Sequence, residues 1–262
     1  MFDPAQLLGL FVLALIAGTI DAMAGGGGLL TVPGLMATGI PPVSALATNK
    51  FQAIFSPISA SYHFWRAGRL DLAKLWRPAL LSAGAAALGA AGLSHIDPNT
   101  LKQMVPFLLM GICGWMLLSE DFGKAPGEAR LSHAAAGLTL VPLVGFYDGF
   151  FGPGTGTFFA LGLVGLTGLT LDQATVEAKL FNLMSNLGAL LFFLVKGHIV
   201  WSFAIVMASG MVTGGAIGAR LVIRHGTGLI KPLLIATSLI MSLRLLWQNG
   251  TLAHWGALLA GH

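Results

Sequence analysis

Residues 21–52 read DAMAGGGGLLTVPGLMATGIPPVSALATNKFQ and place a carboxylate, four consecutive glycines and a lysine inside otherwise apolar sequence. Residues 147–182 read YDGFFGPGTGTFFALGLVGLTGLTLDQATVEAKLFN and repeat the same order of aspartate, glycine-rich turn, apolar segment and lysine. The two lysines, Lys50 and Lys179, define the offset between the copies, 179 − 50 = 129. A repeated order of this kind indicates an internal duplication, so we expect two homologous halves.

The offset between the two lysines holds along both halves without a gap. It pairs Gly39 with Gly168, Ala45 with Ala174, Ser56 with Ser185, Phe64 with Phe193, Gly68 with Gly197 and Lys102 with Lys231. The glycine-rich turn is slightly longer in the second copy, since Asp21 pairs with Asp148 at a smaller offset, 148 − 21 = 127. We therefore predict a first half at residues 1–120, a linker at 121–132 and a second half at 133–262.

The composition excludes a soluble globular domain. Hydrophobic residues make up 55% of the chain, charged residues only 9%, and the mean hydropathy is +0.82, whereas about a quarter of a soluble domain is charged. The apolar runs are continuous over roughly 20 residues instead of alternating, which favours helices over a barrel. The sequence therefore predicts an all-α, polytopic membrane protein with the lipid bilayer as its surroundings.

Other protein classes find little support. The single cysteine, Cys113, excludes internal disulfides and thiolate metal clusters. The basic residues are scattered singly near the ends of the predicted helices, so the net charge of +4 does not indicate nucleic-acid binding. The seven histidines show no metal-ligand spacing, and no convincing serine, histidine and aspartate order is present. We expect no metal, no cofactor and no enzymatic activity.

Five apolar segments are predicted in each half. They cover residues 6–20, 29–40, 44–65, 78–93 and 101–118 in the first half and residues 134–144, 158–166, 173–195, 202–220 and 229–247 in the second. The first two segments of each half are short and flank the glycine-rich turn, so we expect a helical hairpin or two half-helices with an unwound point inside the membrane. The sequence leaves open whether each short pair crosses the bilayer or re-enters it.

The basic residues predict the orientation of the halves. The loop after the third segment is basic in the first half and has only Lys196 in the second, whereas the following loop is basic in the second half and has little beyond Lys102 in the first. Short loops rich in lysine and arginine stay in the cytoplasm. Equivalent loops therefore lie on opposite sides, which predicts inverted repeats with both termini outside and the linker inside.

Lys50 and Lys179 are the central candidates for function. A lysine inside a membrane segment costs about 2.5 to 3.5 kcal/mol on insertion scales and calls for a reason. Each lies a few residues into its helix, roughly 10 Å deep and from opposite faces, so both ammonium groups approach the midplane and could bind an anion. In the alternative, each lysine pairs with an aspartate, Lys50 with Asp21 or Asp148 and Lys179 with the other. A mixed arrangement, with pairs that open for substrate or proton, also fits.

The glycine-rich turns and nearby polar residues complete the predicted site. The turns expose backbone amides at the start of a half-helix, where the positive end of the helix favours an anion, although tight helix crossing without a ligand would also need glycine. The turns lack the lysine and serine or threonine ending of a nucleotide-binding loop. The candidate substrate-binding residues are Gly25, Gly26, Gly27, Asn49, Lys50, Gln52, Gly152, Gly154, Lys179 and Asn182.

Three carboxylates are candidates for carrying a coupling proton, namely Asp21, Asp148 and Glu177. Glu177 stands two residues before Lys179 and has no counterpart in the first half, where Thr48 occupies the equivalent position. The alternative for Glu177 is a position at the helix end in the membrane interface.

At these residues the chain resembles the sulfite exporter TauE/SafE family. The likeness covers nearly the whole chain and is carried by GTIDAMAGGGG at residues 18–28, TNKFQ at 48–52, EAKLFN at 177–182 and KGHIVW at 196–201. It implies a bacterial inner-membrane exporter of sulfite, sulfoacetate or related sulfur-containing anions, driven by the proton gradient. It also points to the glycine turns with Asn49, Lys50, Lys179 and Asn182. Ala178 stands where the first copy has Asn49, which argues against strict two-fold symmetry.

Taken together, the sequence predicts a secondary transporter that binds a small anion at the midplane between its halves and works by alternating access. A passive anion channel is the nearest alternative, and a membrane-embedded enzyme a more distant one without any supporting motif. The identity of the anion, the coupling ion, the direction of flux and the oligomeric state do not follow from the sequence.

Overall fold

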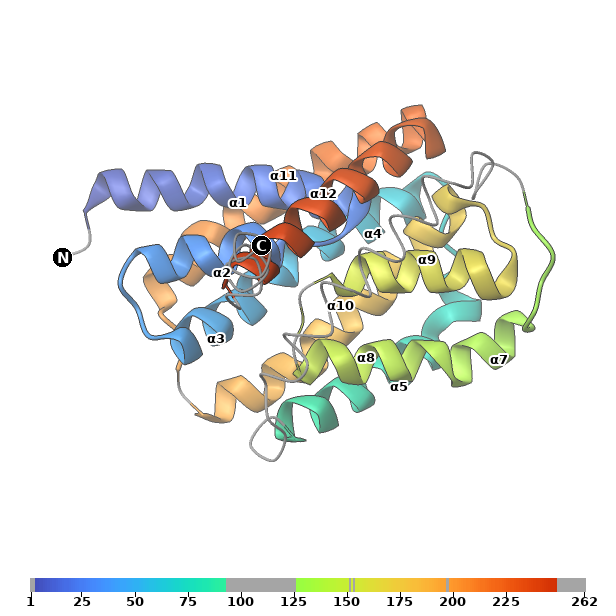
Figure 1. Ribbon diagram of the computed structural model, residues 1–262, viewed down its shortest axis with the longest axis horizontal. Coiled ribbons are helices and arrows are strands. Elements are labelled where there is room, and N and C mark those ends of the chain that lie inside the picture. The colour runs from blue at the N-terminus through green and yellow to red at the C-terminus, as the bar shows by residue number, and fades with distance from the viewer. Residues whose placement is uncertain (1–2, 93–125, 151, 153, 197, 249–262) are drawn as a thin grey trace, which may run out of the picture.

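The computed structural model describes residues 3–92, 126–150, 152, 154–196 and 198–248 (Figure 1). Within these residues all regular secondary structure is helical, and no strand occurs. The helices pack into one bundle, with α1 along the upper edge of Figure 1 and α7 and α8 along the lower edge. The predicted segment at 101–118 and residues 121–125 of the predicted linker lie outside the described residues.

The first half contains α1 (Pro4–Ala24), α2 (Gly28–Ala37), α3 (Pro42–Ala53), α4 (Phe55–Arg66) and α5 (Leu72–Gly92). The expectation that the first segment is short was wrong, because α1 has 21 residues and is long enough to cross a bilayer. The helix begins earlier than predicted because Asp3 caps it by accepting a 3.0 Å hydrogen bond from Ala5 N, and Pro4 suits the first helical turn.

The predicted third segment is divided into α3 and α4 at Ile54. Pro57 explains the interruption, because it has no N–H to donate to the carbonyl of Ala53 and its ring clashes with that carbonyl in a regular helix. The equivalent position in the second half is Asn186, and α10 runs without a break over 26 residues.

The second half contains α7 (His133–Leu138), α8 (Leu140–Phe150), α9 (Thr155–Thr167), α10 (Leu171–Lys196), α11 (Trp201–His225) and α12 (Thr227–Gln248). The starts of α3 and α10 differ by the same offset as Lys50 and Lys179, and so do the starts of α5 and α11. The offset found in the sequence is therefore also the offset between the helix starts.

Each half packs its first predicted segment against the fourth predicted segment of the other half, so that α1 lies along α11 and α8 lies along α5. Glycines permit both contacts. A Cβ on Gly18 would lie 2.9 Å from the carbonyl oxygen of Met211, and a Cβ on the equivalent Gly145 would lie 2.7 Å from that of Ser82, the equivalent of Met211. The same helix crossing thus occurs twice between the two halves, while the opposite orientation of the halves in a membrane stays a prediction.

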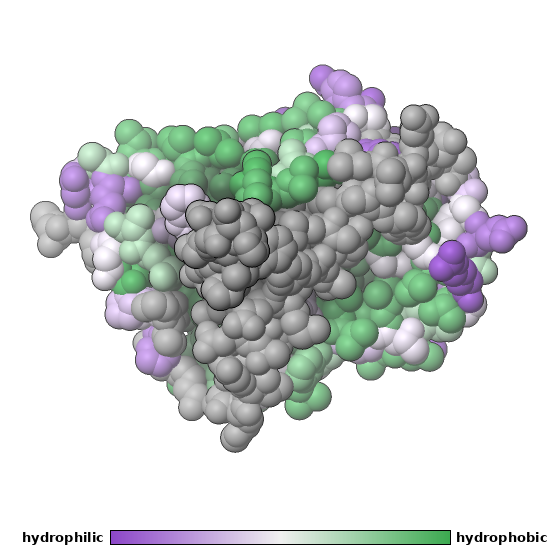
Figure 2. All heavy atoms as spheres, viewed as in Figure 1, coloured by the Kyte–Doolittle hydropathy of each residue, from purple (hydrophilic) through white to green (hydrophobic). Residues whose placement is uncertain are grey.

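The surface fits a membrane environment. Among the described residues, α1, α10 and α11 are long and apolar enough to span a bilayer, and α9 is apolar but shorter. Large apolar side chains on these and other helices are exposed, such as Leu8, Leu143 and Val195. In Figure 2 the hydrophilic residues gather toward the two ends of the molecule, and hydrophobic surface lies between them. The prediction of an all-α polytopic membrane protein is therefore supported.

Candidate functional site

The first glycine-rich turn separates α1 from α2. Gly25 and Gly26 have φ angles of 78° and 89°, a region that side-chain-bearing residues rarely adopt. Gly25 N donates to the carbonyl of Asp21 at 2.8 Å, and Gly27 N donates to the Asp21 carboxylate at 3.3 Å. The turn therefore folds back over the last turn of α1 and its aspartate.

The second glycine-rich turn, between α8 and α9, meets the first one. Gly152 and Gly154 have φ angles of 87° and 81°. A Cβ on Gly25 would lie 2.7 Å from Thr157 N, and the Thr157 hydroxyl donates to the carbonyl of Ala24 at 2.9 Å. The two glycine-rich turns are thus in backbone contact. This contact is one reason why Gly25 has no room for a side chain.

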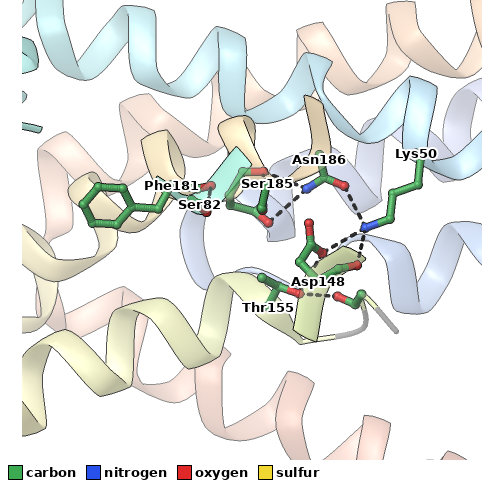
Figure 3. Close-up of polar contacts among 9 residues, drawn as sticks. Lys50, Ser82, Asp148, Thr155, Phe181, Ser185 and Asn186 are labelled. Carbon is green, nitrogen blue, oxygen red and sulfur yellow. Dashed lines mark hydrogen bonds and ion pairs between the residues drawn. The ribbon is translucent and has the colours of Figure 1, made fainter. Parts of the chain in front are cut away.

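Lys50 reaches across to the second half. Its ammonium group donates to the carbonyl of Asp148 at 2.7 Å, to the carboxylate oxygen Oδ1 of Asp148 at 3.0 Å and to Oδ1 of Asn186 at 3.3 Å. Figure 3 shows these three acceptors around the end of the Lys50 side chain. Lys50 and Asp148 are 5% and 2% exposed, so this is a buried ion pair.

Lys179 makes the reciprocal reach into the first half. It is 1% exposed, and its ammonium group donates to the carbonyl of Asp21. Within the described part of the chain, no carboxylate oxygen forms an ion pair with Lys179. Lys50 therefore donates to a carbonyl near the end of α8, and Lys179 donates to a carbonyl near the end of α1. Of the two, only Lys50 also forms an ion pair with an aspartate carboxylate of the described residues.

A cavity of about 40 Å³ lies between the two turns. It is large enough for a few water-sized groups. Nine of the candidate residues line it: Asp21, Gly26, Gly27, Asn49, Lys50, Asp148, Gly152, Gly154 and Asn182. Four do not, namely Gly25, Gln52, Glu177 and Lys179. The two lysines thus differ, because Lys50 lines the cavity and Lys179 lies behind its wall.

Asn49 presents a donor to the cavity. Its oxygen Oδ1 accepts hydrogen bonds from the Thr31 hydroxyl at 2.6 Å and from Nε2 of Gln52 at 2.7 Å. With the oxygen occupied, the Nδ2 group is the part of Asn49 that remains for a ligand. Gln52 is completely buried behind Asn49 and acts by fixing the amide orientation.

Asn182 is oriented in the same way by Asn186. Nδ2 of Asn186 donates to the carbonyl of Asn182 at 2.8 Å and to its side-chain oxygen at 3.1 Å. The amide nitrogen of Asn182 is therefore the group left for the cavity. Asn186 thus connects Lys50 with Asn182.

Several residues of the site were missed in the sequence. They are Thr31, Ser56, Thr155 and Asn186. Asn186 could have been found, because it lies four residues after Asn182 and so shares its helix face. The threonines and Ser56 carry no comparable signal in the sequence.

Glu177 lies away from the cavity. It accepts a 2.7 Å hydrogen bond from Nε2 of His133, at the start of α7, and its side chain is 17% exposed. Glu177 is the seventh residue of α10, and its location in the membrane interface stays a prediction. No group of three or more histidine, cysteine or acidic side chains in the described residues could hold a metal ion.

The charges around the cavity balance. Two carboxylates, Asp21 and Asp148, accompany two ammonium groups, Lys50 and Lys179, when all four are ionised. The side chains of Asn49 and Asn182 border this small cavity, and both glycine-rich turns form part of its wall. A polytopic helical membrane protein with such a space between two related sets of helices has the architecture of a membrane transporter.

The chain belongs to the family described as "Sulfite exporter TauE/SafE", whose model matches residues 10–245. It is 42% identical to "Probable membrane transporter protein ORF9" from Sinorhizobium sp over 90% of this chain and 91% of that protein. It is 39% identical to "Probable membrane transporter protein" from Haemophilus influenzae, covering 92% and 94% of the two chains, and 39% identical to "Probable membrane transporter protein YfcA" from Escherichia coli K12, covering 97% and 96%. No solved structure matches the chain significantly. Membership of this family confirms the resemblance found in the sequence and supports a membrane transporter.

Proposed function

We propose that this protein is a secondary transporter that exports small sulfur-containing anions, such as sulfite, sulfoacetate or other organosulfonates, across the inner membrane of a bacterium. The family name supports the substrate class. The observation that carries the proposal is the cavity between the two glycine-rich turns, whose lining includes the buried residues Lys50, Asn49 and Asn182. An ammonium group, amide donors and backbone N–H groups are the ligands that oxyanions prefer.

The proposed mechanism is alternating access coupled to protons. The cavity lies where elements of both halves meet, so a movement of one half against the other would change which side it opens to. Asp21 and Asp148 line the cavity and are the candidate proton carriers, while Glu177 is a weaker candidate because it pairs with His133 outside the cavity. Lys179 supports the site from behind, through its bond to the carbonyl of Asp21.

Binding by the purified protein is the first test. Thermal-shift measurements against sulfite, sulfate, sulfoacetate and taurine should reveal stabilisation by at least one sulfur-containing anion. Replacing Lys50 with glutamine should weaken that binding by roughly ten- to a hundredfold, because a hydrogen bond to a charged group contributes about 1.5 to 3 kcal/mol. Lys179→Gln should weaken it less. The control is Ser209→Ala, which removes an exposed hydroxyl on α11.

Transport in liposomes separates a carrier from a channel. With the membrane potential held at zero, a carrier loaded inside with unlabelled anion should accumulate labelled anion from outside by exchange, whereas a channel should only equilibrate the label. Stabilisation by none of the four compounds, or wild-type binding in both lysine variants, would remove the basis of the proposal.

A further inference from the structure

The ammonium group of Lys50 has no N–H left for a ligand in this structure. A lysine ammonium has three donors, and here they meet the carbonyl of Asp148, the carboxylate of Asp148 and the side chain of Asn186. An anion that binds Lys50 must therefore displace one of these acceptors. The Asp148 carboxylate is the acceptor that resembles the substrate.

The Asp148 carboxylate is only half satisfied. Its oxygen Oδ1 accepts from Lys50 at 3.0 Å and from the Thr155 hydroxyl at 2.8 Å. Its other oxygen, Oδ2, is buried and has no hydrogen-bond partner in the described part of the chain. A buried carboxylate oxygen without a partner is costly, and protonation relieves that cost because a carboxyl group can donate its O–H.

The balance of charge adds a second reason. With Lys50, Lys179, Asp21 and Asp148 ionised, the site is neutral, so an incoming anion would leave an uncompensated negative charge in a buried place. One proton taken up with the anion restores the balance for a monovalent substrate. The proton has to reach a carboxylate that lies beside the bound anion.

We propose that Asp148 occupies the anion's position on Lys50 in the empty transporter, and that the anion takes this position when Asp148 is protonated. A proton from water adds to Asp148, which weakens its bond to Lys50. The released N–H of Lys50 then donates to the anion, and the new O–H of Asp148 provides a further donor. This proposal rests on the proposed anion transport. It describes that transport as symport of one proton with the anion, in which Asp148 carries the proton.

Asp21 is not equivalent to Asp148. Each of its carboxylate oxygens has a donor within reach, Gly27 N at 3.3 Å and the Ser56 hydroxyl at 3.0 Å, a hydroxyl that Asp21 shares with the carbonyl of Gly18. Lys179 contacts its carbonyl and not its carboxylate. Asp148 is therefore the carboxylate whose place on a lysine ammonium group an anion can take.

Few other charged groups surround Asp148. α9 has no titratable residue, and α5 meets this end of α8 through uncharged residues such as Ala86 and Gly89. The remaining titratable residues on the neighbouring elements are Asp21 on α1, Lys50 on α3, Lys74 and Arg77 near the start of α5, His133 on α7, Tyr147 on α8, and Asp172, Glu177, Lys179 and Lys196 on α10. Among the residues that the structure describes, only Lys50 forms an ion pair with Asp148.

Symport has a consequence for the direction of flux. Because the proton and the anion move together, an inward proton gradient favours entry of the anion. Net export then needs an outward anion gradient or, for a dianion moving with one proton, the inside-negative membrane potential.

The test measures the pH dependence of binding with sulfoacetate as the probe, since its acid groups stay ionised above about pH 6. In isothermal titration of the full-length protein, the wild-type affinity should fall with rising pH, by up to about tenfold per unit where one proton is linked. Asp148→Asn mimics the protonated carboxyl group, so its affinity should be independent of pH and close to the wild-type value at the acidic end. Ser209→Ala on α11, the control outside the cavity, should keep the wild-type dependence on pH.

A second variant guards against poor folding of Asp148→Asn. Thr155→Val removes the hydroxyl that stabilises the Asp148 carboxylate, so the pH at which affinity falls should move upward. In liposomes containing a pH-sensitive dye, a sulfoacetate gradient should move protons with the wild type, and Asp148→Asn should move sulfoacetate alone.

The outcomes separate the two proposals. Wild-type binding that does not change with pH, a normal pH dependence in Asp148→Asn, or an unshifted midpoint in Thr155→Val would overturn the role of Asp148 and leave anion transport standing. Absence of sulfoacetate binding at every pH, together with failure of the other anions, would overturn both.

Discussion

At the scale of single residues, the two lysines that the repeat makes equivalent have different surroundings. Lys50 faces Asn186, whereas the position equivalent to Asn186 in the first half is Pro57. Asn49 has Ala178 as its counterpart, and Asn182 has Ala53. Polar side chains therefore gather around Lys50, and Lys179 is left with a backbone acceptor. The proposed anion site therefore depends mainly on Lys50.

Gln52 provides a prediction at this scale. Its Nε2 fixes Asn49, but its Oε1 is buried without a partner in the described residues. Gln52→Met keeps the volume and removes the unsatisfied oxygen, so the melting temperature should stay equal or rise. Anion affinity should nevertheless fall roughly three- to tenfold, because Asn49 loses one of the two hydrogen bonds that orient it.

The control for Gln52→Met is a double-mutant cycle. In an Asn49→Ala background, Gln52→Met should cause no further loss of affinity, since the residue acts through Asn49. Additive losses in the double variant would contradict this role.

At the scale of helices, glycines decide how closely elements approach. A Cβ on Gly210, Gly214 or Gly218 of α11 would lie within 2.6 Å of a carbonyl oxygen of α1. These glycines recur every four residues and so form one face of α11. Gly89 on α5 meets the carbonyl of Phe146 in the same way, at the position equivalent to Gly218. Close packing of small residues is the usual means of helix association in membranes.

A pair of alanine substitutions tests this packing. Gly214→Ala places a Cβ 2.2 Å from the carbonyl oxygen of Leu15 and should destabilise the protein by about 1 to 3 kcal/mol, because α11 must move away from α1. Gly84→Ala on α5 meets nothing within 4 Å and should leave the melting temperature unchanged or higher, since alanine is the better helix former. Equal melting temperatures of the two variants in detergent would argue against the contact.

At the scale of the whole molecule, the two halves are joined by reciprocal contacts. Lys50 of the first half bonds to Asp148 of the second, and Lys179 of the second half bonds to Asp21 of the first. The first helical segment of each half also packs on the other half. Neither half can form the cavity by itself, because its lining comes from both.

The predicted inversion of the halves can be tested by cysteine labelling. Arg69 and His198 are equivalent positions in exposed loops. In a Cys113→Ala background, an impermeant maleimide added to intact cells should label His198→Cys and should label Arg69→Cys only after the cells are opened, because equivalent loops then lie on opposite sides. The loss of the exposed Arg69 and Asp172 ion pair in the second variant should cost little stability. Labelling of both positions from the same side would refute inverted repeats.

The sequence by itself determined the membrane class, the duplication, the family and most of the cavity lining, because hydrophobicity, a fixed repeat offset and glycine-rich turns are local properties of the chain. Only the tertiary structure decided that Lys50 lines the cavity while Lys179 lies behind it, that Asp148 and not Asp21 forms the ion pair, and that Asn186 joins the site. These distinctions depend on which side chains from distant segments share one buried space. The duplication gives the two halves the same order of segments, whereas the different side chains packed around Lys50 and Lys179 give the two lysines different roles.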